Sequence, residues 1–290
     1  RLAAKTAKPL MPLRGLARKL RWGITFGMAL LRQQWMPPDT RTALRGRLNG
    51  RKQVAWSAPI PLHDIALIRR RLGGRVNDVM LTTLAGALRR YLQARGEIKP
   101  ALTVRLAVPV NLRPYEEEIR LGNQFAVVFP CLPLGITDPV MRLKAVRTRM
   151  DRINILPEAM ANRVMINLVG WLPAWLEQWA LRLFGMRATA VMTNVPGPPA
   201  ALYLAGARLR QPLFWVPQSG DIGMGVSILS YDGNVQFGLM TDHKLVPDPQ
   251  SIVDRFASEF DKFLMLVLME PWERLGDPDA VAAALAQELP

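Results

Sequence analysis

The stretch from Gly74 to Leu92, GRVNDVMLTTLAGALRRYL, predicts a long amphipathic helix that opens with an Asn-Asp pair. At about 100° per residue, the apolar stripe that contains Leu81 and Leu84 lies within about 60° of Asn77. Asn77 therefore heads the stripe, and we expect its amide to point towards the core or a cleft. Asp78 suits the positive end of the helix, which predicts a structural, capping role for it. Helix rules alone leave Asn77 either as a cap or as a residue that faces chemistry.

Helices and strands interleave on both sides of this stretch, which predicts the α/β (α+β) class with a mixed β-sheet flanked by helices. The run NQFAVVFPCLPL is apolar on both faces and is expected to be a central strand. The other expected strands are 52–62, 103–110 and a hairpin over 221–242. The other expected helices are 63–74, 140–153, helical segments around 157–186, and 249–268.

The hairpin DIGMGVSILSYDGNVQFGLMTD is the clearest β signal, because Asp232-Gly233 is a strong tight-turn pair between two alternating runs. Its first arm places Gly223, Gly225 and Ser227 on one face. Three small residues in a row let another backbone or a ligand approach closely, so we regard them as candidate substrate-binding residues.

A second motif, MTNVPGPPAALYLAG, ends an apolar strand with Thr193 and Asn194. Pro196 and Gly197 begin a Pro-Gly-Pro-Pro loop that has few alternative conformations, and we assign them structural roles. A hydroxyl and an amide held by a rigid loop at a strand end are candidate contacts for an oxyanion or a substrate. The alternative is a turn whose side chains satisfy one another.

The net charge of +15 is concentrated at one end of the chain. Residues 1–52 hold 13 Lys and Arg against one acid, Asp39, a net charge of +12, so the remainder carries +3. We therefore divide the chain into a basic amphipathic linker or helical segment (1–51), a domain (52–275) and a polar tail (276–290). The basic segment suits either an anionic membrane surface or a solvated helix packed on the domain.

Several chemistries are excluded by the residues present. Two histidines and a single cysteine, Cys131, give neither a zinc-ligand set nor an internal disulfide, which fits a reducing compartment. The sequence contains no nucleophile elbow, no dinucleotide loop and no phosphate-binding GK[ST] motif. We expect no metal and no cofactor. A nucleic-acid partner is disfavoured, because the charge lies in one segment without a platform of aromatic residues.

Six segments together resemble the C-terminal part of the bacterial wax ester synthase/diacylglycerol acyltransferase family, in the family's order. They are LNGRKQVAW, GGRVNDVMLTTLAGALRRYL, VPVNLRP, LGNQFAVVFPCLPL, TNVPGPPAALYLAGA and GVSILSYDGNVQFGLMTD, and the resemblance spans about residues 40–270. The Asn-Asp and Asn-Val-Pro-Gly-Pro elements are its most specific parts.

The resemblance implies half of a chloramphenicol acetyltransferase-like fold and acyl-CoA-dependent O-acyl transfer to a long-chain alcohol or diacylglycerol. The family's general base is a histidine of an HHxxxDG motif in the N-terminal half, and this sequence has no adjacent histidine pair. The resemblance places Asn77 near that base, with Thr193 and Asn194 bordering the reaction centre. We therefore expect a half-enzyme that is inactive alone.

The partners implied by the resemblance are acyl-CoA as substrate, the acceptor alcohol and an N-terminal HHxxxDG domain. The expected location is cytoplasmic, at the periphery of a membrane or lipid droplet. The alternative function is a non-catalytic lipid- or acyl-CoA-binding module that works alone.

Overall fold

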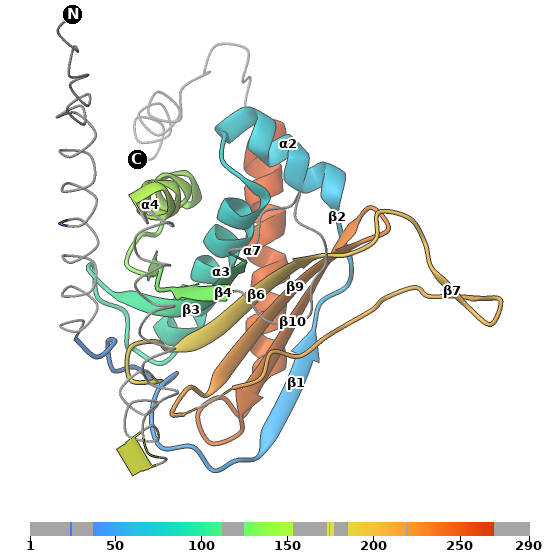
Figure 1. Ribbon diagram of the computed structural model, residues 1–290. Coiled ribbons are helices and arrows are strands. Elements are labelled where there is room, and N and C mark those ends of the chain that lie inside the picture. The colour runs from blue at the N-terminus through green and yellow to red at the C-terminus, as the bar shows by residue number, and fades with distance from the viewer. Residues whose placement is uncertain are drawn as a thin grey trace, which may run out of the picture.

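The computed structural model describes residues 24, 37–111, 125–152, 173, 175, 176, 185–218 and 220–269. Its main feature is a mixed sheet in which strands follow the order β1–β10–β9–β6–β3–β4, while β2 pairs with β10 and β5 with β3 (Figure 1). Strands β3, β6 and β9 run parallel to one another, and the other pairs are antiparallel. The strands are β1 (Lys52–Trp56), β2 (Ile60–Pro61), β3 (Thr103–Asn111), β4 (Phe125–Val128), β5 (Cys131–Pro133), β6 (Ala190–Pro196), β9 (Met224–Tyr231) and β10 (Asn234–Asp242).

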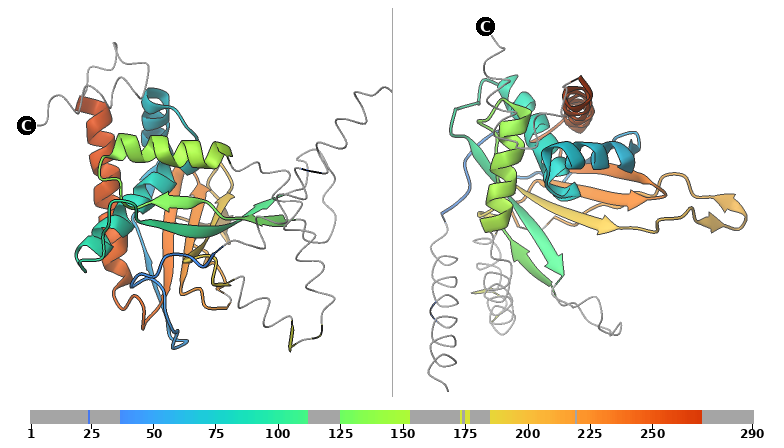
Figure 2. Two further views of the ribbon diagram at one scale, coloured as in Figure 1. Left: turned by 90° about the vertical axis from the view of Figure 1, so that its left-hand side faces the viewer. Right: turned by 90° about the horizontal axis from the view of Figure 1, so that it is seen from above.

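Helices cover one face of this sheet. Helices α2, α3 and α7 pack on that face, and α4 lies beside α3 (Figures 1 and 2). Their bounds are α2 (Leu62–Leu72), α3 (Val76–Gln93), α4 (Pro139–Arg152) and α7 (Pro249–Met269). The predicted class, a mixed sheet flanked by helices, is confirmed. None of these described helices is long and apolar enough to cross a membrane.

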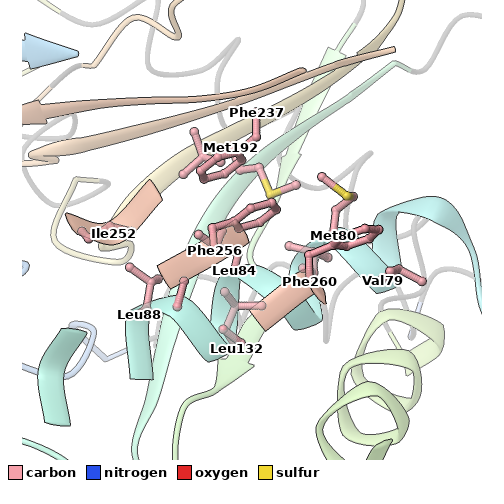
Figure 3. Close-up of a cluster of buried hydrophobic side chains, with 14 of the residues drawn as sticks. Val79, Met80, Leu84, Leu88, Leu132, Met192, Phe237, Ile252, Phe256 and Phe260 are labelled. Atoms are coloured by element: carbon pink, nitrogen blue, oxygen red, sulfur yellow. The ribbon is translucent and has the colours of Figure 1, made fainter. Parts of the chain in front are cut away.

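The hydrophobic core lies between the sheet and α3 and α7. Phe237 of β10 stacks on Phe256 of α7 with ring centroids 3.8 Å apart, and Met192 of β6 lies beside them (Figure 3). Leu84 and Leu88 of α3 complete the cluster and are fully buried. Helix α3 is buried around its whole circumference from Asp78 to Leu88, so it is the central helix rather than a surface one.

One strand assignment was wrong. The run expected to form a central strand divides into β4 and β5, which both pair with β3, and β4 ends the described strand order. Both of its faces are apolar because two clusters bury them: Leu132 and Leu134 join the main core, while Val127 and Phe129 join a smaller cluster. Burial on both faces does not require a neighbouring strand on both sides.

The β9–β10 hairpin forms as predicted. Its turn residues Asp232 and Gly233 have φ angles of 47° and 72°, the left-handed pair that a two-residue turn of type I′ requires. Glycine supplies one of these positions without steric cost. The resulting register pairs Ser227 with Gly238.

Part of the expected linker packs on the domain. Leu44 is a fully buried member of the core, and Asp39 is buried as well. One Asp39 carboxylate oxygen accepts hydrogen bonds from Arg105 N (2.7 Å) and Thr189 Oγ1 (2.5 Å). Residues 37–51 are therefore fastened to β3 and to the start of β6. Residues 1–23 and 25–36 of the basic segment, most of the expected helical segments around 157–186, and the predicted tail lie outside the described residues.

Candidate functional site

The structure joins the two motifs that the sequence singled out. Asn77 lies in the first turn of α3, and Asn194 lies near the carboxyl end of β6, 117 residues later. The side-chain Nδ2 of Asn194 donates a hydrogen bond to the side-chain oxygen Oδ1 of Asn77. Each amide keeps unused donor or acceptor capacity after this bond, since an Asn side chain offers two donors and two lone pairs. The pair is thus a small polar patch that can bind a further polar group.

Asn77 does not point into the core, which was one of the two directions that the helical wheel left open. Its side chain is exposed, although Leu81 follows on the same stripe and is buried. Continuous burial of α3 begins only at Asp78, so the stripe emerges from the domain at its first turn. The wheel gives the direction of a side chain but not how far the core extends along the helix. Asn77 therefore lies at the rim of the described domain.

Thr193 lies on the other face of β6 from the asparagine pair. Successive side chains in a strand point to opposite faces. Met192 belongs to the core beneath the helices, as does Ala190, whereas Val191 packs against the smaller cluster. Asn194 shares the helix-covered face with Met192, and Thr193 points away from it. The structure brings Asn77 and Asn194 together and separates Thr193 from them.

The residues predicted to be structural hold the backbone in place, through a hydrogen bond to a backbone N–H group or through a close approach of two backbone segments. Asp78 is buried, and its Oδ2 accepts a hydrogen bond from Arg75 N at 2.7 Å, which satisfies an N–H group at the start of α3. Gly197 N donates to Ser230 O at 2.9 Å. A Cβ on Gly197 would collide with that same carbonyl oxygen, so a glycine is needed for the loop after Pro196 to follow β9 this closely.

The small residues of β9 are covered by protein. Gly223, Gly225 and Ser227 are all buried. A Cβ on Gly225 would lie 2.9 Å from Val216 O, which is tighter than real contacts allow. Of the two possibilities that the sequence left open, a close backbone approach accounts for Gly225. The proposed contact of these residues with substrate stays a prediction.

Neither of the two described histidines forms a hydrogen bond with the asparagine pair. His63 is exposed, and its Nε2 lies 2.8 Å from the carboxylate of Asp64. His243 follows the end of β10 that pairs with Met224, whereas Asn194 pairs with Ile228 further along β9. Burial raises the pKa of the Cys131 thiol above its ordinary value, which disfavours a nucleophilic thiolate. No cluster of possible metal ligands occurs in the described part of the chain.

Sequence reasoning missed one buried ionic contact. Arg142 of α4 and Glu259 of α7 are both buried, with Nη1 3.0 Å from Oε2. Arg142 also donates to the carbonyl oxygens of Ile136 and Thr137. Burial lowers the pKa of Arg142 below its ordinary value, although the hydrogen bond to Glu259 opposes this. Its only sequence signal is an arginine within an otherwise apolar helix face.

Comparison with known proteins relates the chain to a described family and to curated proteins. Residues 121–263 match the family model described as the WS/DGAT C-terminal domain. The chain is 27% identical over 211 residues to "Probable diacyglycerol O-acyltransferase tgs1" of Mycobacterium tuberculosis (strain ATCC 25618 / H37Rv), covering 71% of this chain and 45% of that protein. It is 34% identical over 208 residues to "Putative diacyglycerol O-acyltransferase Rv2484c" of the same strain, covering 71% and 41%.

Solved structures show the same fold. The wax ester synthase/diacylglycerol acyltransferase from Marinobacter aquaeolei VT8 superposes with a TM-score of 0.58 at 20% identity, over 90% of this chain and 58% of that one. The epimerization domain from the third module of tyrocidine synthetase B gives a TM-score of 0.52 at 13% identity, over 86% of this chain and 60% of that one. The chain spans less than half the length of the two curated relatives above. Residues 121–263 are therefore identified as belonging to the WS/DGAT C-terminal domain family.

Proposed function

We propose that the chain is the C-terminal half of an acyl-CoA-dependent O-acyltransferase that esterifies a long-chain alcohol or diacylglycerol. The observation that carries the proposal is the hydrogen bond between Asn77 and Asn194. It gathers the two most specific family motifs into one polar patch at the rim of the domain. Family membership and the printed names of the relatives support the same reaction class.

In this proposal the general base comes from the part of the relatives that the chain does not span. The base removes the proton of the acceptor hydroxyl, and the resulting oxygen attacks the thioester carbonyl of acyl-CoA. The carbon–sulfur bond then breaks, the ester leaves, and the CoA thiolate takes up the proton held by the base. No enzyme-bound acyl intermediate is needed, in keeping with the absence of a nucleophile elbow from the sequence.

Asn77 acts as a positioning residue in this scheme. With its carbonyl oxygen occupied by Asn194, its amide N–H groups are available to orient the base or the acceptor hydroxyl. The role of Thr193 as a donor to the tetrahedral intermediate stays a prediction outside this scheme, because Thr193 lies on the opposite face of β6 from the asparagine pair. A substrate can reach Gly223, Gly225 and Ser227 only if the residues that cover this face, such as Val216 beside Gly225, move away.

The test is a chimera in which this chain replaces the matching part of Rv2484c, assayed for acyl transfer from acyl-CoA to a long-chain alcohol and to diacylglycerol. We expect the chimera to be active and the chain alone to be inactive. Asn77→Ala should lower kcat by about 10- to 100-fold while KM for acyl-CoA and the melting temperature change little. Gln250→Ala is the matched control, because it removes an exposed amide that binds Asp254 on α7.

Two outcomes contradict the proposal. An Asn77→Ala chimera with full activity and a stability loss of only about 1 kcal/mol identifies Asn77 as an element of the helix start alone. An inactive chimera that is folded and binds acyl-CoA favours the alternative, a non-catalytic lipid- or acyl-CoA-binding module.

A further inference from the structure

Strands β3 and β6 pair over a short stretch only. Their parallel ladder consists of Leu106 with Ala190 and Ala107 with Val191, and it ends there. On its other side, β6 stays paired with β9 as far as Pro196. The right-hand view of Figure 2 shows the arrows of β3 and β6 pointing apart. Within the described sheet, the carboxyl half of β6 therefore has one open edge.

A proline in β3 ends the ladder. Leu106 N donates to Pro130 O, on the side of β3 that faces away from β6. Backbone groups of successive residues in a strand face opposite sides, so Ala107 and Pro109 face β6. Because proline has no N–H group, Pro109 cannot donate the next hydrogen bond to β6. The separation of the two strands is thus encoded in the sequence of β3.

The same alternation identifies the unpaired groups of β6. Gly197 N donates to Ser230 O, so the backbone of Gly197 faces β9. Counting back along β6, the backbone groups of Asn194 and Met192 face β3 instead. Among the described residues, none donates to the Met192 carbonyl oxygen, and none bonds the backbone of Asn194. Met192 is only 2% exposed, and folded proteins rarely leave a buried carbonyl group without a partner.

Burial decreases on both strands where they separate. On β3, Ala107 is buried and residues 108–110 are half-buried, while on β6, Met192 is buried and residues 193–194 are half-buried. The side chain of Asn194 also bonds Asn77. The open edge of β6 therefore lies next to the asparagine pair.

The chemistry of an open strand edge selects its ligand. Backbone acceptors and donors in alternation bind an extended chain that carries amide groups, as when a peptide adds a strand to a sheet edge. Of the proposed substrates, only acyl-CoA contains amides, which lie in its pantetheine arm a short distance from the thioester. A long-chain alcohol or diacylglycerol has no amide group.

We propose that the edge of β6 from Met192 to Asn194 binds the pantetheine arm of acyl-CoA, which lies as an added strand between β6 and β3. One amide N–H of the arm donates to the Met192 carbonyl oxygen, and the carbonyl oxygen of the other amide accepts from Asn194 N. The thioester then follows near the asparagine pair, where the acceptor hydroxyl attacks. The inference rests on the proposed function and assigns the site of its acyl donor.

A probe that cannot be turned over tests the site, on the full chain and on the Rv2484c chimera. The probe is S-octyl pantetheine, a thioether, and its reference compound has both amides replaced by esters. Because the esters cannot donate to the Met192 carbonyl oxygen, the reference compound should bind about tenfold more weakly in calorimetry. Hydrogen exchange followed by NMR should show that the probe protects Asn194 N–H. Thr193 N–H, which faces β9, is the internal control and should exchange at an unchanged rate.

Pro109→Val restores the missing N–H group and lets β3 continue its ladder to the Met192 carbonyl oxygen. We expect a higher melting temperature together with about tenfold weaker binding of the probe, because the added backbone bond competes with the ligand. A proline with a purely structural role would not combine these two changes. Pro59→Val is the matched control, since Pro59 is exposed between β1 and β2 and should leave the affinity unchanged.

The pantetheine site is overturned if neither protein binds the probe, if the amide and ester compounds bind equally, or if Asn194 N–H stays unprotected. Acyl carrier proteins present the same arm, so the chimera is also assayed with an acylated carrier protein, and a preference for it would overturn the assignment to CoA. Binding as predicted in a chimera without acyl transfer would contradict the proposed function alone. An active chimera that uses thioesters with and without amides equally well would contradict the pantetheine site alone.

Discussion

Two neighbouring residues at the start of α3 have different surroundings. Asp78 is buried and accepts a hydrogen bond from Arg75 N, whereas Asn77 is exposed and contacts another motif. Asp78→Ala should therefore lower the free energy of unfolding by about 1 kcal/mol, because a buried backbone N–H group loses its acceptor. Urea unfolding measures this loss. Asp78→Asn, which keeps an acceptor oxygen, should lose less, and equal losses for both variants would contradict the role of this hydrogen bond.

Asp242, at the end of β10, is a buried residue whose negative charge stabilises the fold. Its side chain is fully buried, and its carboxylate accepts hydrogen bonds from the backbone N–H groups of Asn49, Gly50 and Lys244. Burial alone would raise the pKa of Asp242, but these bonds and nearby Lys52 outweigh it and hold the pKa below the ordinary value. The carboxylate thus ties residues 49 and 50 to the β10 end.

The stability that Asp242 provides should depend on pH. Because its pKa is lower in the folded state, its contribution is complete above the unfolded pKa, about 3.9, and is lost as pH falls through the folded value. Asp242→Asn should lower the free energy of unfolding by about 1–3 kcal/mol at pH 7. Urea unfolding at decreasing pH should show the wild-type and variant curves converging below about pH 4. A difference that stays constant with pH would contradict the charge-based account.

At the scale of elements, Gly86 permits α3, α4 and α7 to meet. A Cβ at Gly86 would collide with the buried Arg142–Glu259 pair. Gly86→Ala gains about 1 kcal/mol of helix propensity, but displacing a pair locked by the carbonyl oxygens of Ile136 and Thr137 costs more. We expect a net loss of about 1–2 kcal/mol in the free energy of unfolding.

A double-mutant cycle checks that prediction. In a chain that carries Arg142→Met and Glu259→Leu, the polar ends that meet residue 86 are gone. Gly86→Ala should then be neutral or stabilising, so the coupling free energy between the sites is the measured quantity. Equal effects in both backgrounds would show that the cost arises elsewhere in α3.

Elements defined by local signals could be predicted from the sequence. Helix α3 and the β9–β10 hairpin form where periodicity and the Asp232-Gly233 turn place them. The edge position of β4 could not be read, because apolarity reports burial and not the identity of the covering neighbour. The contacts of Asp39 and Arg142 were also missed. Their partners, Thr189 and Glu259, lie far along the chain, and no local pattern links them.

At the scale of the whole molecule, the sequence singled out motifs that the fold brings into contact, but it did not predict on which face of a strand each side chain lies. The catalytic roles of Asn77 and Asn194 stay predictions, but the family motifs that singled them out lie 117 residues apart in the sequence and meet in the fold. They also grouped Thr193 with Asn194, and strand alternation separates the two. The small hairpin of β7 (Tyr203–Leu204) and β8 (Ala207–Arg208) was predicted only as part of a rigid loop, because a hairpin of two-residue strands outside any core has no extended apolar periodicity.

The asymmetry of charge along the whole chain yields the remaining prediction. Residues 1–36 carry eight Lys and Arg and no acid, whereas residues beyond 52 are nearly balanced. Each base near an anionic membrane contributes about 1 kcal/mol, and salt screens that attraction over a Debye length of about 10 Å at 0.1 M. The full chain should therefore bind phosphatidylserine vesicles at low salt, release them at high salt, and bind neutral phosphatidylcholine vesicles weakly.

Deleting residues 1–36 should abolish this binding in a sedimentation assay, and replacing Arg14, Arg18 and Lys19 with Gln should reduce it while leaving the apolar residues in place. The triple variant separates charge from apolar insertion, because only the electrostatic contribution is lost. Equal binding by the truncated chain would show that the domain itself, and not the basic segment, contacts the lipid. It would then be tested at the exposed apolar pair of Val54 and Trp56 on the edge strand β1.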